Sequence, residues 1–424
     1  MKKTFNSNPL PQQQEAGVTA TDVEKQVEGE TTSFEDDSQQ PQIAWDDPRE
    51  IRNPRNWSTA MRILHTAIPC FLAFEITFAT SITVPATTHI MQEFSVSRTR
   101  SILPLTLYTL GLGFGPLFMA PFSEVFGRKP LYAVSCTFLL AFLGGSSSAT
   151  TFPALLACRF LAGTLGSAGI AVGAGTIADV WELGKGTAAS LLFILGPFLG
   201  PTLGPLAGAY VLEARGGDWR WTQYVLLMVG APIWVGILLM RETSKSWILR
   251  KENGEPTVTL SRLGGLAKTA VMRPTKMLFT EIIVSSLALY TAYAYAMIFS
   301  YFASCSYVLQ RYYGSNPRQV GLSFISIIIG YMLAALVYGF LDARFRMPAV
   351  RAGTATPEQR LYAALVGSVL IPFGLFWYAW EAREGGNWAA LVAAGIPFGL
   401  GAFCLFVSRH LISTLSERDT NETA

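Results

Sequence analysis

Between Gly196 and Gly208 the chain reads G-P-F-L-G-P-T-L-G-P-L-A-G. Glycine recurs at every fourth position, so a helix carries all the glycines on one face, where a neighbouring backbone can approach closely. Each proline removes a backbone donor, which a helix tolerates within a bilayer because neighbouring helices satisfy the freed carbonyls. The stretch therefore predicts a membrane-spanning helix that packs tightly and bends. The residues of this pattern are Gly196, Pro197, Gly200, Pro201, Gly204, Pro205 and Gly208.

The amino-acid composition is that of a protein embedded in lipid. Half of the 424 residues are hydrophobic, only 14% are charged and the mean hydropathy is +0.34, whereas about 25% of the residues in soluble domains are charged. The net charge of +3 gives no reason to expect a nucleic-acid partner. The five cysteines and three histidines show no metal-ligand spacing and no catalytic arrangement. We therefore expect no enzyme activity, no metal and no cofactor.

Apolar runs long enough to cross a membrane, which takes roughly 20 residues, recur along the chain. About ten are present, at 65–85, 102–122, 131–150, 154–178, 187–212, 221–241, 281–304, 320–341, 361–380 and 388–408. They predict an all-α polytopic membrane protein whose surroundings are the lipid bilayer. We expect the chain to be a monomer.

Polar segments divide these runs into two groups. Most of the 32 Lys and Arg residues fall on the side of the membrane that the amino-terminal segment shares, which places the amino terminus in the cytosol. The predicted parts are a disordered cytosolic tail, a first transmembrane half with spans 1–6, a cytosolic central loop, a second half with spans 7–10 and a polar cytosolic tail. Their residues are 1–60, 61–241, 242–280, 281–408 and 409–424.

Two motifs in the first half carry a resemblance to a known family. The sequence A-P-F-S-E-V-F-G-R-K-P over Ala120–Pro130 resembles the loop signature of the major facilitator superfamily, with alanine and glutamate where glycine and aspartate are usual. Arg159, followed by Gly163 and Gly166, resembles the second motif of that superfamily. The glycine–proline stretch resembles the motif of its drug:proton antiporter branch.

Further stretches narrow the resemblance. D-P at Asp47–Pro48 and N-P-R-N-W-S over Asn53–Ser58, before the first run, resemble the fungal drug and polyamine exporters of that branch, as does R-E-T over Arg241–Thr243. The resemblance extends from about Trp45 to Ser408 and implies a fold of twelve spans in two six-helix halves. Because this chain offers six spans and then about four, we expect an incomplete second half, and truncation is the favoured explanation.

Only two ionisable side chains lie well inside the predicted spans, Glu75 in the first and Arg159 in the fourth. A charge inside the membrane costs at least roughly 2.5–3.5 kcal/mol, so it is normally paired, hydrated or functional. The two lie at similar depths, and the resemblance implies that both spans line a central cavity. We hypothesise that they pair directly or through water, and that protonation of Glu75 weakens the pair and couples protons to transport. Alternatively, Arg159 caps backbone carbonyls and Glu75 meets cavity water.

The loop cluster of Glu124, Gly127, Arg128 and Lys129 has two interpretations. Anchoring of Arg128 and Lys129 on the cytosolic side accounts for both charges. The resemblance implies in addition a cytosolic gate, a charge clasp between the two halves that steadies the outward-facing state. In the family this clasp engages the eleventh helix, which is not among the runs predicted here.

Two further features bear on the substrate cavity. The glycine–proline stretch serves either tight packing alone or a bend that seals the cavity against leakage. Tyr290 and Tyr293 lie in the middle of the seventh run, where they can hold a flat or cationic substrate by stacking or cation–π contact if they face the cavity. Tyrosine near a membrane boundary is otherwise an interfacial residue.

These features predict a proton-coupled secondary transporter that exports small organic molecules such as drugs, polyamines or toxic metabolites made by the cell. A proton-coupled nutrient importer and a truncated, non-transporting membrane protein are the alternatives. No nucleotide-binding motif is present in the sequence, so the energy must come from an ion gradient or from the gradient of the substrate. We expect a multi-pass protein of the plasma membrane, with the vacuolar membrane as the alternative.

Overall fold

The computed structural model describes residues 45, 47–182, 186–254, 272, 275–352 and 362–422 of the chain. These residues form helices and connecting turns, with no β-strand among them. The predicted all-α class is therefore confirmed. Most of the expected tail 1–60 and the middle of the expected loop 242–280 lie outside the described residues.

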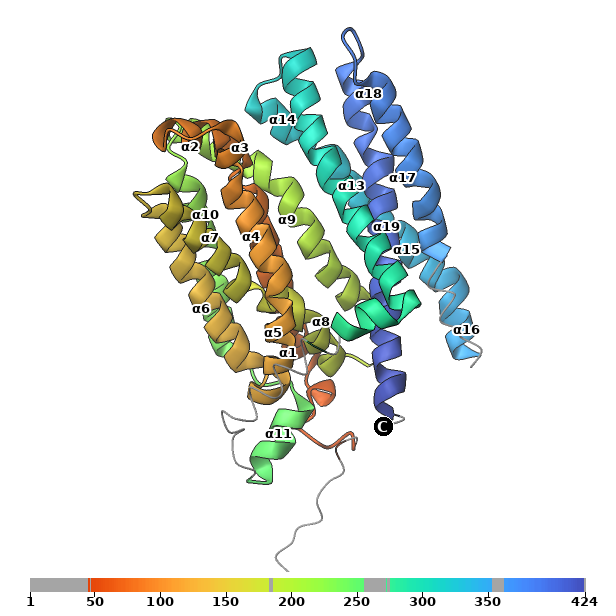
Figure 1. Ribbon diagram of the computed structural model, residues 1–424. Coiled ribbons are helices and arrows are strands. Elements are labelled where there is room, and N and C mark those ends of the chain that lie inside the picture. Colours follow the sequence, from red (N-terminus) through yellow and green to blue (C-terminus); the bar gives the residue numbers. More distant parts are fainter. Residues whose placement is uncertain are drawn as a thin grey trace, which may run out of the picture.

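The helices form two groups, which we call the first group and the second group (Figure 1). The first group consists of α1 Thr59–Ser81, α2 Thr87–Glu93, α3 Arg98–Ser101, α4 Leu103–Phe114, α5 Pro116–Phe126, α6 Arg128–Ser147, α7 Phe152–Gly166, α8 Ala168–Val180, α9 Thr187–Ala214 and α10 Arg220–Leu239. The second group consists of α13 Ile282–Tyr313, α14 Pro317–Ser323, α15 Ile325–Leu341, α16 Met347–Arg351, α17 Tyr362–Glu381, α18 Trp388–Ala393 and α19 Gly395–Glu422. The short helix α11 Lys245–Glu252 lies at one end of the first group, which we call the α11 end (Figure 1).

Nine helices in the described residues are long and apolar enough to cross a membrane, judged by length and composition. The count rises to ten when Arg98–Phe114 and Pro116–Phe126, which are bent by 43° at a break, form one span. The break falls before Pro116, whose ring and missing amide interrupt a helix. Several other spans are built from consecutive helices, as in Phe152–Val180. The expectation of about ten apolar spans is therefore confirmed.

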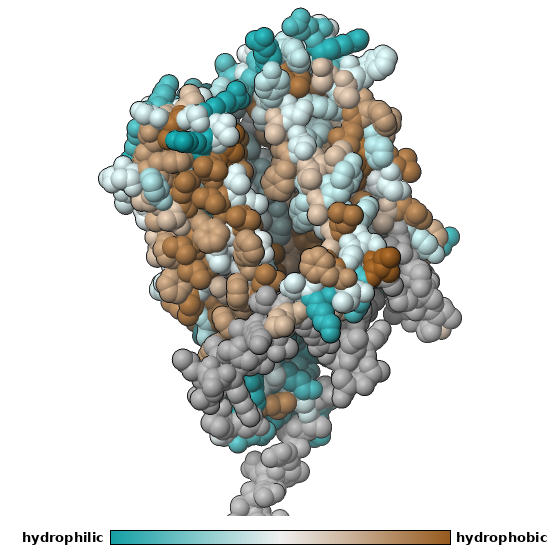
Figure 2. All heavy atoms as spheres, viewed as in Figure 1, coloured by the Kyte–Doolittle hydropathy of each residue, from teal (hydrophilic) through white to brown (hydrophobic). Residues whose placement is uncertain are grey.

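The surface has the distribution of side chains that a bilayer requires. Figure 2 shows hydrophobic residues over the flanks of the first group, whereas hydrophilic residues gather at the ends. Large apolar side chains are exposed on the flanks of both groups, among them Phe71 at 60%, Leu239 at 70% and Phe376 at 78%. Such exposure is unfavourable in water and favourable against lipid tails.

Each group has its own buried core, and α9 belongs to both. One core joins α1, α4, α6 and α10, with Leu72, Tyr132 and Leu226 fully buried in it. The other joins the helices of the second group and also takes in Phe193 and Phe198 of α9. In addition to α1, helix α9 contacts α14, α15 and α19. Among the described residues, helix α9 is therefore the main element through which the first group meets the second.

The glycines of α9 lie against the backbone of α1, as their spacing predicts. A methyl group added at Gly200 would lie 2.5 Å from the backbone nitrogen of Phe78, and one added at Gly208 would lie 2.1 Å from the carbonyl oxygen of Ile82. Distances this short leave no room for a side chain, because the neighbouring atoms are backbone and cannot rotate away. The four-residue spacing thus brings α9 into direct contact with α1 along three turns.

Candidate functional site

The first buried charge, Glu75 of α1, points into the interior of the first group. It is fully buried, and neither carboxylate oxygen has a hydrogen-bond partner among the described residues. Its Oε1 lies against Gly230 of α10, where a methyl group would approach to 2.2 Å, and Leu140 of α6 lies beside the same position. The carboxylate therefore occupies a space between α1, α6 and α10 that exists because residue 230 has no side chain.

The second buried charge, Arg159 of α7, binds the end of α1. Its Nη1 donates to the carbonyl oxygen of Ala79 at 3.2 Å, and its Nη2 donates to the hydroxyl of Thr83 at 2.7 Å. The last four carbonyls of a helix lack an intrahelical donor, and Ala79 is within that turn of α1. The expected direct pair between Glu75 and Arg159 is therefore not formed, and Arg159 instead satisfies an unpaired backbone carbonyl.

Tyr108 of α4 contacts both Arg159 and the turn of α1 that carries Glu75. Nothing in the sequence pointed to this role. It is fully buried, and its hydroxyl donates to the carbonyl oxygen of Ile76 at 2.9 Å. The guanidinium of Arg159 stands over its ring, with the carbon Cζ 5.2 Å from the ring centroid. Cation–π contact contributes roughly 2 kcal/mol or more when the charge is desolvated. Tyr108 therefore supports Arg159 and touches the helix turn that carries Glu75.

A network of charges at the α11 end uses two of the four residues of the predicted gate. Nε of Arg128 donates to Asp179 of α8 at 3.1 Å, and Nη1 donates to the hydroxyl of Ser123 at 2.7 Å. The backbone amides of Arg128 and Lys129 donate to the carboxylate of Glu242 at 2.7 and 3.1 Å. All these contacts lie within the first group and the segment that follows it.

The other two residues of the predicted gate take part through the backbone. Gly127 adopts φ = 91°, a conformation that favours glycine, and a methyl group there would lie 2.5 Å from Oε2 of Glu242. The side chain of Glu124 is exposed, and its backbone carbonyl accepts a hydrogen bond from Arg250 of α11. Sequence reasoning missed Asp179 and identified Glu242 only within the R-E-T stretch, without its role as the acceptor at the start of α6.

The segment that precedes α1, residues 50–57, also contacts the α11 end. Arg52 donates to Glu50 and, at 2.5 Å, to Glu252 of α11. The hydrogen bonds from Arg52 lower the pKa of Glu50 from 4.5 to about 2. His65 of α1 accepts the backbone amide of Arg241 at 2.8 Å. The N-P-R-N-W-S and R-E-T stretches are therefore brought together around the start of α1.

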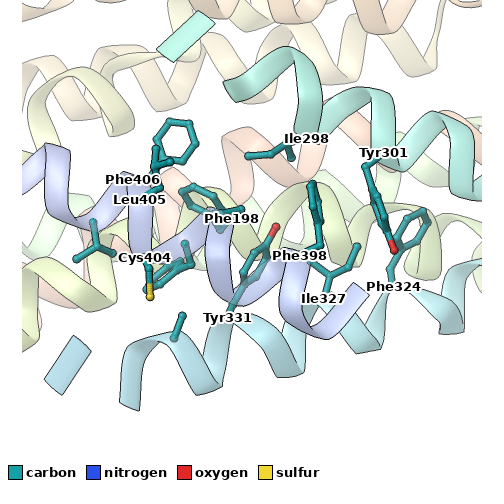
Figure 3. Close-up of a cluster of buried hydrophobic side chains, with 14 of the residues drawn as sticks. Phe198, Ile298, Tyr301, Phe324, Ile327, Tyr331, Phe398, Cys404, Leu405 and Phe406 are labelled. Atoms are coloured by element: carbon teal, nitrogen blue, oxygen red, sulfur yellow. The ribbon is translucent and has the colours of Figure 1, made fainter. Parts of the chain in front are cut away.

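The interface between the two groups contains a small cavity beside the prolines of α9. Its volume is about 30 Å³. Its lining comes from α9, α13 and α15, and the residues are Pro197, Phe198, Pro201, Tyr295, Ile298, Phe299, Phe302 and Tyr331. Figure 3 shows Tyr331 reaching from α15 toward Phe198 and Ile298. The glycine face of α9 thus meets α1, while two of its prolines border the second group.

Tyr331 of α15 places a polar group in this apolar interface. It is fully buried, and its hydroxyl has no hydrogen-bond partner among the described residues. Its ring meets Phe198 edge to face at 5.3 Å between centroids and lies 5.9 Å from Phe403 of α19. Sequence reasoning missed Tyr331, because one tyrosine in an apolar run gives no signal of its surroundings.

The two tyrosines predicted to line the substrate cavity lie elsewhere. Tyr290 and Tyr293 of α13 are 48% and 65% exposed, and neither is among the residues that line the cavity. Tyr295 and Phe299 of the same helix line it instead. Whether Tyr290 and Tyr293 contact a substrate stays a prediction. The structure places neither at this cavity, because location along a span does not determine which face a residue occupies.

Polar contacts join the groups near the two ends of α9. Close to the α11 end, Nη1 of Arg346 donates to Asp342 at 2.7 Å and to the hydroxyl of Thr187 at 3.4 Å. Toward the opposite end, Glu213 of α9 forms an ion pair with Arg318 of α14. Together with the aromatic contacts of Phe198, they connect α9 to the second group over its length.

A bundle with apolar flanks and helices long enough to span a bilayer is that of a polytopic membrane protein, and buried polar atoms without partners inside such a bundle mark candidate functional sites. The family model described as Major Facilitator Superfamily matches residues 70–415. The chain therefore belongs to the major facilitator superfamily, as the motifs predicted.

Fungal transporters of this superfamily are similar to the chain over most of its length. It is 33% identical to Polyamine transporter 4 of Saccharomyces cerevisiae over 96% of this chain and 68% of that protein. It is also 33% identical to the MFS-type transporter traF of Penicillium crustosum, over 87% of this chain and 77% of that one. The chain is likewise 33% identical to the MFS-type efflux pump MFS2 of Trichophyton rubrum, over 85% of this chain and 63% of that one.

Solved structures support the fold at low sequence identity. The xylose transporter XylE of E. coli in a partially occluded inward-open conformation matches with a TM-score of 0.55 and 11% identity, over 84% of this chain and 87% of that chain. The human organic anion transporter MFSD10 matches with a TM-score of 0.53 and 15% identity, over 84% and 86% of the two chains. The chain is thus a membrane transporter in its fold and family, and not an enzyme.

Proposed function

We propose that the protein is a proton-coupled secondary transporter that moves small organic molecules out of the cytosol. Drugs, polyamines and toxic metabolites made by the cell are the substrate classes that the names of its relatives suggest, since they include a polyamine transporter and an efflux pump. Proton coupling is proposed on the basis of the residues of α1, α7 and α10. The efflux pump among the relatives supports the proposed direction of transport.

The observation that carries proton coupling is the isolation of Glu75. An ionised carboxylate at membrane depth, without a donor or a cation beside it, is unfavourable. Glu75 is fully buried and its oxygens have no partner among the described residues. Protonation is therefore favoured in this packing, and release of the proton requires a rearrangement that admits water or a cation to Glu75. A rearrangement linked to proton release is the requirement for coupling.

Arg159 provides a connection between that rearrangement and α1. Its guanidinium binds Ala79, four residues after Glu75 and one turn further along the helix. Movement of α1 relative to α7 therefore changes the surroundings of both charges. In this proposal the network of Arg128, Asp179 and Glu242 holds the α11 end in one state, and α9 carries the motion to the second group, as in rocking of one bundle against another.

The proposed topology places the α11 end in the cytosol. Arg128, Lys129 and the basic residues of α11 lie at this end, and basic residues favour the cytosolic side. We propose the plasma membrane, with the vacuolar membrane as the alternative. Labelling of single cysteines in intact cells tests the orientation: a cysteine introduced at exposed position 251 of α11 should react with a membrane-impermeant maleimide only after permeabilisation.

The transport function is tested in sealed proteoliposomes that contain the purified full chain. An imposed pH gradient should drive uptake of radiolabelled spermidine or of a cationic fluorescent dye against its concentration gradient. Glu75→Gln and Arg159→Ala should each abolish accumulation driven by the gradient while surface expression in cells stays normal. Gradient-driven transport by Glu75→Gln at the rate of the unmodified protein would contradict the coupling role.

The two alternative functions give different results in the same system. A nutrient importer moves the substrate in the same direction as the protons, whereas an exporter of the proposed kind exchanges them. A non-transporting protein shows no flux of any probe although it is folded and inserted. Proton flux measured with an internal pH dye, together with substrate flux, therefore distinguishes the three.

A further inference from the structure

A second hollow, which we call the α1–α10 pocket, lies at the α11 end of the first group. Its volume is about 240 Å³. Its lining comes from the segment that precedes α1, from the first turn of α1 and from Arg241, two residues after the end of α10. The volume is several times the roughly 30 Å³ that one water molecule occupies in the liquid. The pocket therefore has room for a polyatomic group such as a phosphate.

The side chains that line the α1–α10 pocket supply positive charge and hydrogen-bond donors. Arg241 is exposed, and among the described residues its hydrogen bond is that of the backbone amide to His65, so its guanidinium is unpaired there. Arg49 binds Asp47 through Nε and Nη2, which leaves its Nη1 without a partner in the described part of the chain. The hydroxyl of Ser58 makes no capping hydrogen bond to α1. Two guanidinium groups and one hydroxyl thus remain able to donate to an anion.

No carboxylate opposes an anion here, since the described residues that line the pocket include no Asp or Glu. The acidic side chains nearby are bound to other groups. Asp47 pairs with Arg49, Glu50 is buried in an ion pair, and Glu242 accepts the amides at the start of α6. Because Asp47 offsets part of the charge of Arg49, Arg241 provides the larger share of the attraction. Guanidinium groups bind phosphate oxygens by charge-assisted hydrogen bonds.

Exposed apolar side chains place the pocket at the edge of the bilayer. Leu239, the last residue of α10, is 70% exposed and precedes Arg241 by two positions. On α1, Leu64 and Phe71 are 40% and 60% exposed, and their spacing of seven puts them on one face of the helix. Ile51, which lines the pocket itself, is 78% exposed. Apolar surface of this kind is favourable against lipid tails, so the basic pocket lies at the level of the lipid headgroups.

We propose that the α1–α10 pocket binds the phosphate-bearing headgroup of an anionic phospholipid. The phosphate accepts hydrogen bonds from Arg241, Arg49 and Ser58, and Ile51 contacts the glycerol and the adjoining part of the acyl chains. In the proposed topology this leaflet faces the cytosol, where the membrane surface is negatively charged. A bound headgroup ties the segment that precedes α1 to the end of α10. Such a site exists whether or not the protein transports a substrate.

Native mass spectrometry of the purified full chain in detergent tests the site, because it resolves single bound lipids. The probes are dioleoylphosphatidylserine and dioleoylphosphatidylcholine, offered together in equal amounts. They share acyl chains and a phosphate, but choline adds a fixed positive charge that would lie beside Arg241 and Arg49. The chain should retain phosphatidylserine at least about fivefold more than phosphatidylcholine, as expected where a basic residue meets an anionic headgroup. Equal retention of the two lipids would overturn the proposal.

Two variants test the arginines of the lining. Arg241→Gln should remove most of the preference for phosphatidylserine, and Arg49→Gln should reduce it less, because Asp47 already offsets part of that charge. Lys251→Gln is the matched control, since it removes one positive charge from an exposed residue of α11 that does not line the pocket. It should keep the preference. An unchanged preference in Arg241→Gln, or an equal loss in Lys251→Gln, would contradict the assignment.

The substituted side chains contribute little to the stability of the fold. The backbone amide of Arg241 donates to His65 whatever its side chain is, and Arg49 is 83% exposed in its pair with Asp47, where ion pairs stabilise weakly. The unfolding temperatures of both variants without added lipid should therefore match that of the unmodified chain. A loss of lipid preference at an unchanged unfolding temperature then reports on the headgroup contact.

Inorganic phosphate offers the same oxygens as the headgroup, and a second measurement separates the two sources. The unfolding temperature of the delipidated full chain in detergent is measured in ammonium phosphate and in ammonium acetate at the same pH and ionic strength. The two values should agree, because inorganic phosphate lacks the apolar part that contacts Ile51. Stabilisation by phosphate that Arg241→Gln abolishes would assign the pocket to a soluble phosphate compound and overturn the lipid assignment.

Discussion

The carboxylate of Glu75 lies against the α-carbon of Gly230. A methyl group at position 230 would come within 2.2 Å of Oε1 and within 2.5 Å of Leu140 Cδ2. The absence of a side chain on α10 therefore provides the space that the buried acid of α1 occupies. Two residues separated by more than 150 positions in the chain thus depend on each other for their packing.

Gly230→Ala should displace Glu75 and destabilise the protein. Insertion of a methyl group into a filled core costs about 1–3 kcal/mol, and the unfolding temperature should fall by several degrees in a thermal scan. Gly236→Ala is the control on the same helix, because its added methyl would lie 3.4 Å from Ile68, an ordinary contact. Equal stability of the two variants would show that Glu75 does not fill the space beside Gly230.

A double variant tests whether the effect passes through the carboxylate. With Glu75→Ala present, the methyl of Gly230→Ala no longer meets the carboxylate and clashes only with the end of the Leu140 side chain, which can rotate. The two changes should therefore be non-additive by about 1 kcal/mol or more, within the usual range for residues in contact. Additive losses in the cycle would mean that Leu140 alone accounts for the clash.

Gly200→Ala should separate α9 from α1. Its methyl would lie 2.2 Å from the hydroxyl of Thr77 and 2.5 Å from the backbone nitrogen of Phe78, and the backbone atom cannot rotate away. We expect a loss of about 1–3 kcal/mol, measured as a lower unfolding temperature. In contrast, Gly144→Ala in α6 meets no atom within 4 Å and should gain roughly 0.5–1 kcal/mol from helix propensity. A stability ranking in the opposite order would contradict the close contact.

Glu242→Ala should loosen the start of α6. The carboxylate accepts the backbone amides of Arg128 and Lys129, and also that of Ser244 at 2.9 Å. Loss of such a cap costs about 0.5–2 kcal/mol, and hydrogen exchange in the first turn of α6 should become faster. Glu252→Ala, which removes a partly exposed partner of Arg52, should leave the exchange of α6 unchanged. Unaltered protection in Glu242→Ala would mean that other acceptors replace the carboxylate.

The pairing of Glu50 with Arg52 should not respond to cytosolic pH. The pKa of Glu50 is lowered from 4.5 to about 2 by its hydrogen bonds with Arg52. A lowered carboxyl pKa means that the stabilisation is fully present above about pH 4.5 and is lost as the pH falls through about 2. Hydrogen exchange of residues 50–57 should therefore be protected equally at about pH 5 and pH 8, after correction for intrinsic rates. Lost protection at about pH 5 would contradict the ion pair.

The sequence predicted the features that depend on local spacing. The apolar runs matched the membrane-spanning helices, and the four-residue glycine spacing predicted the close contact of α9 with a neighbour, which is α1. Glu75 and Arg159 stood out because charged residues are rare inside apolar runs. These features follow from helix geometry and from the energetics of the bilayer, both of which can be applied to one segment at a time.

The partners of these residues could not be predicted, because they depend on how helices distant in sequence rotate against each other. Arg159 reaches the end of α1 rather than Glu75, and Asp179 rather than a residue of the second group binds Arg128. Tyr290 and Tyr295 differ by five positions on one helix, which is enough to place the second, but not the first, at the cavity. The position of a residue along its helix follows from the sequence, whereas the neighbour that its side chain faces depends on tertiary packing.

The two faces of α9 differ in the kind of motion that they permit. Toward α1 the contact is backbone on glycine, which has no rotatable side chain and cannot slide without collision. Toward α15 and α19 the contact is made by the ring of Phe198 with Tyr331 and Phe403, at 5.3 and 5.5 Å between centroids. Side chains such as these can change between staggered rotamers, whereas the backbone contact with α1 has no such freedom. We therefore expect that in any rocking motion α9 moves together with α1, whereas the contacts of Phe198 with the second group rearrange.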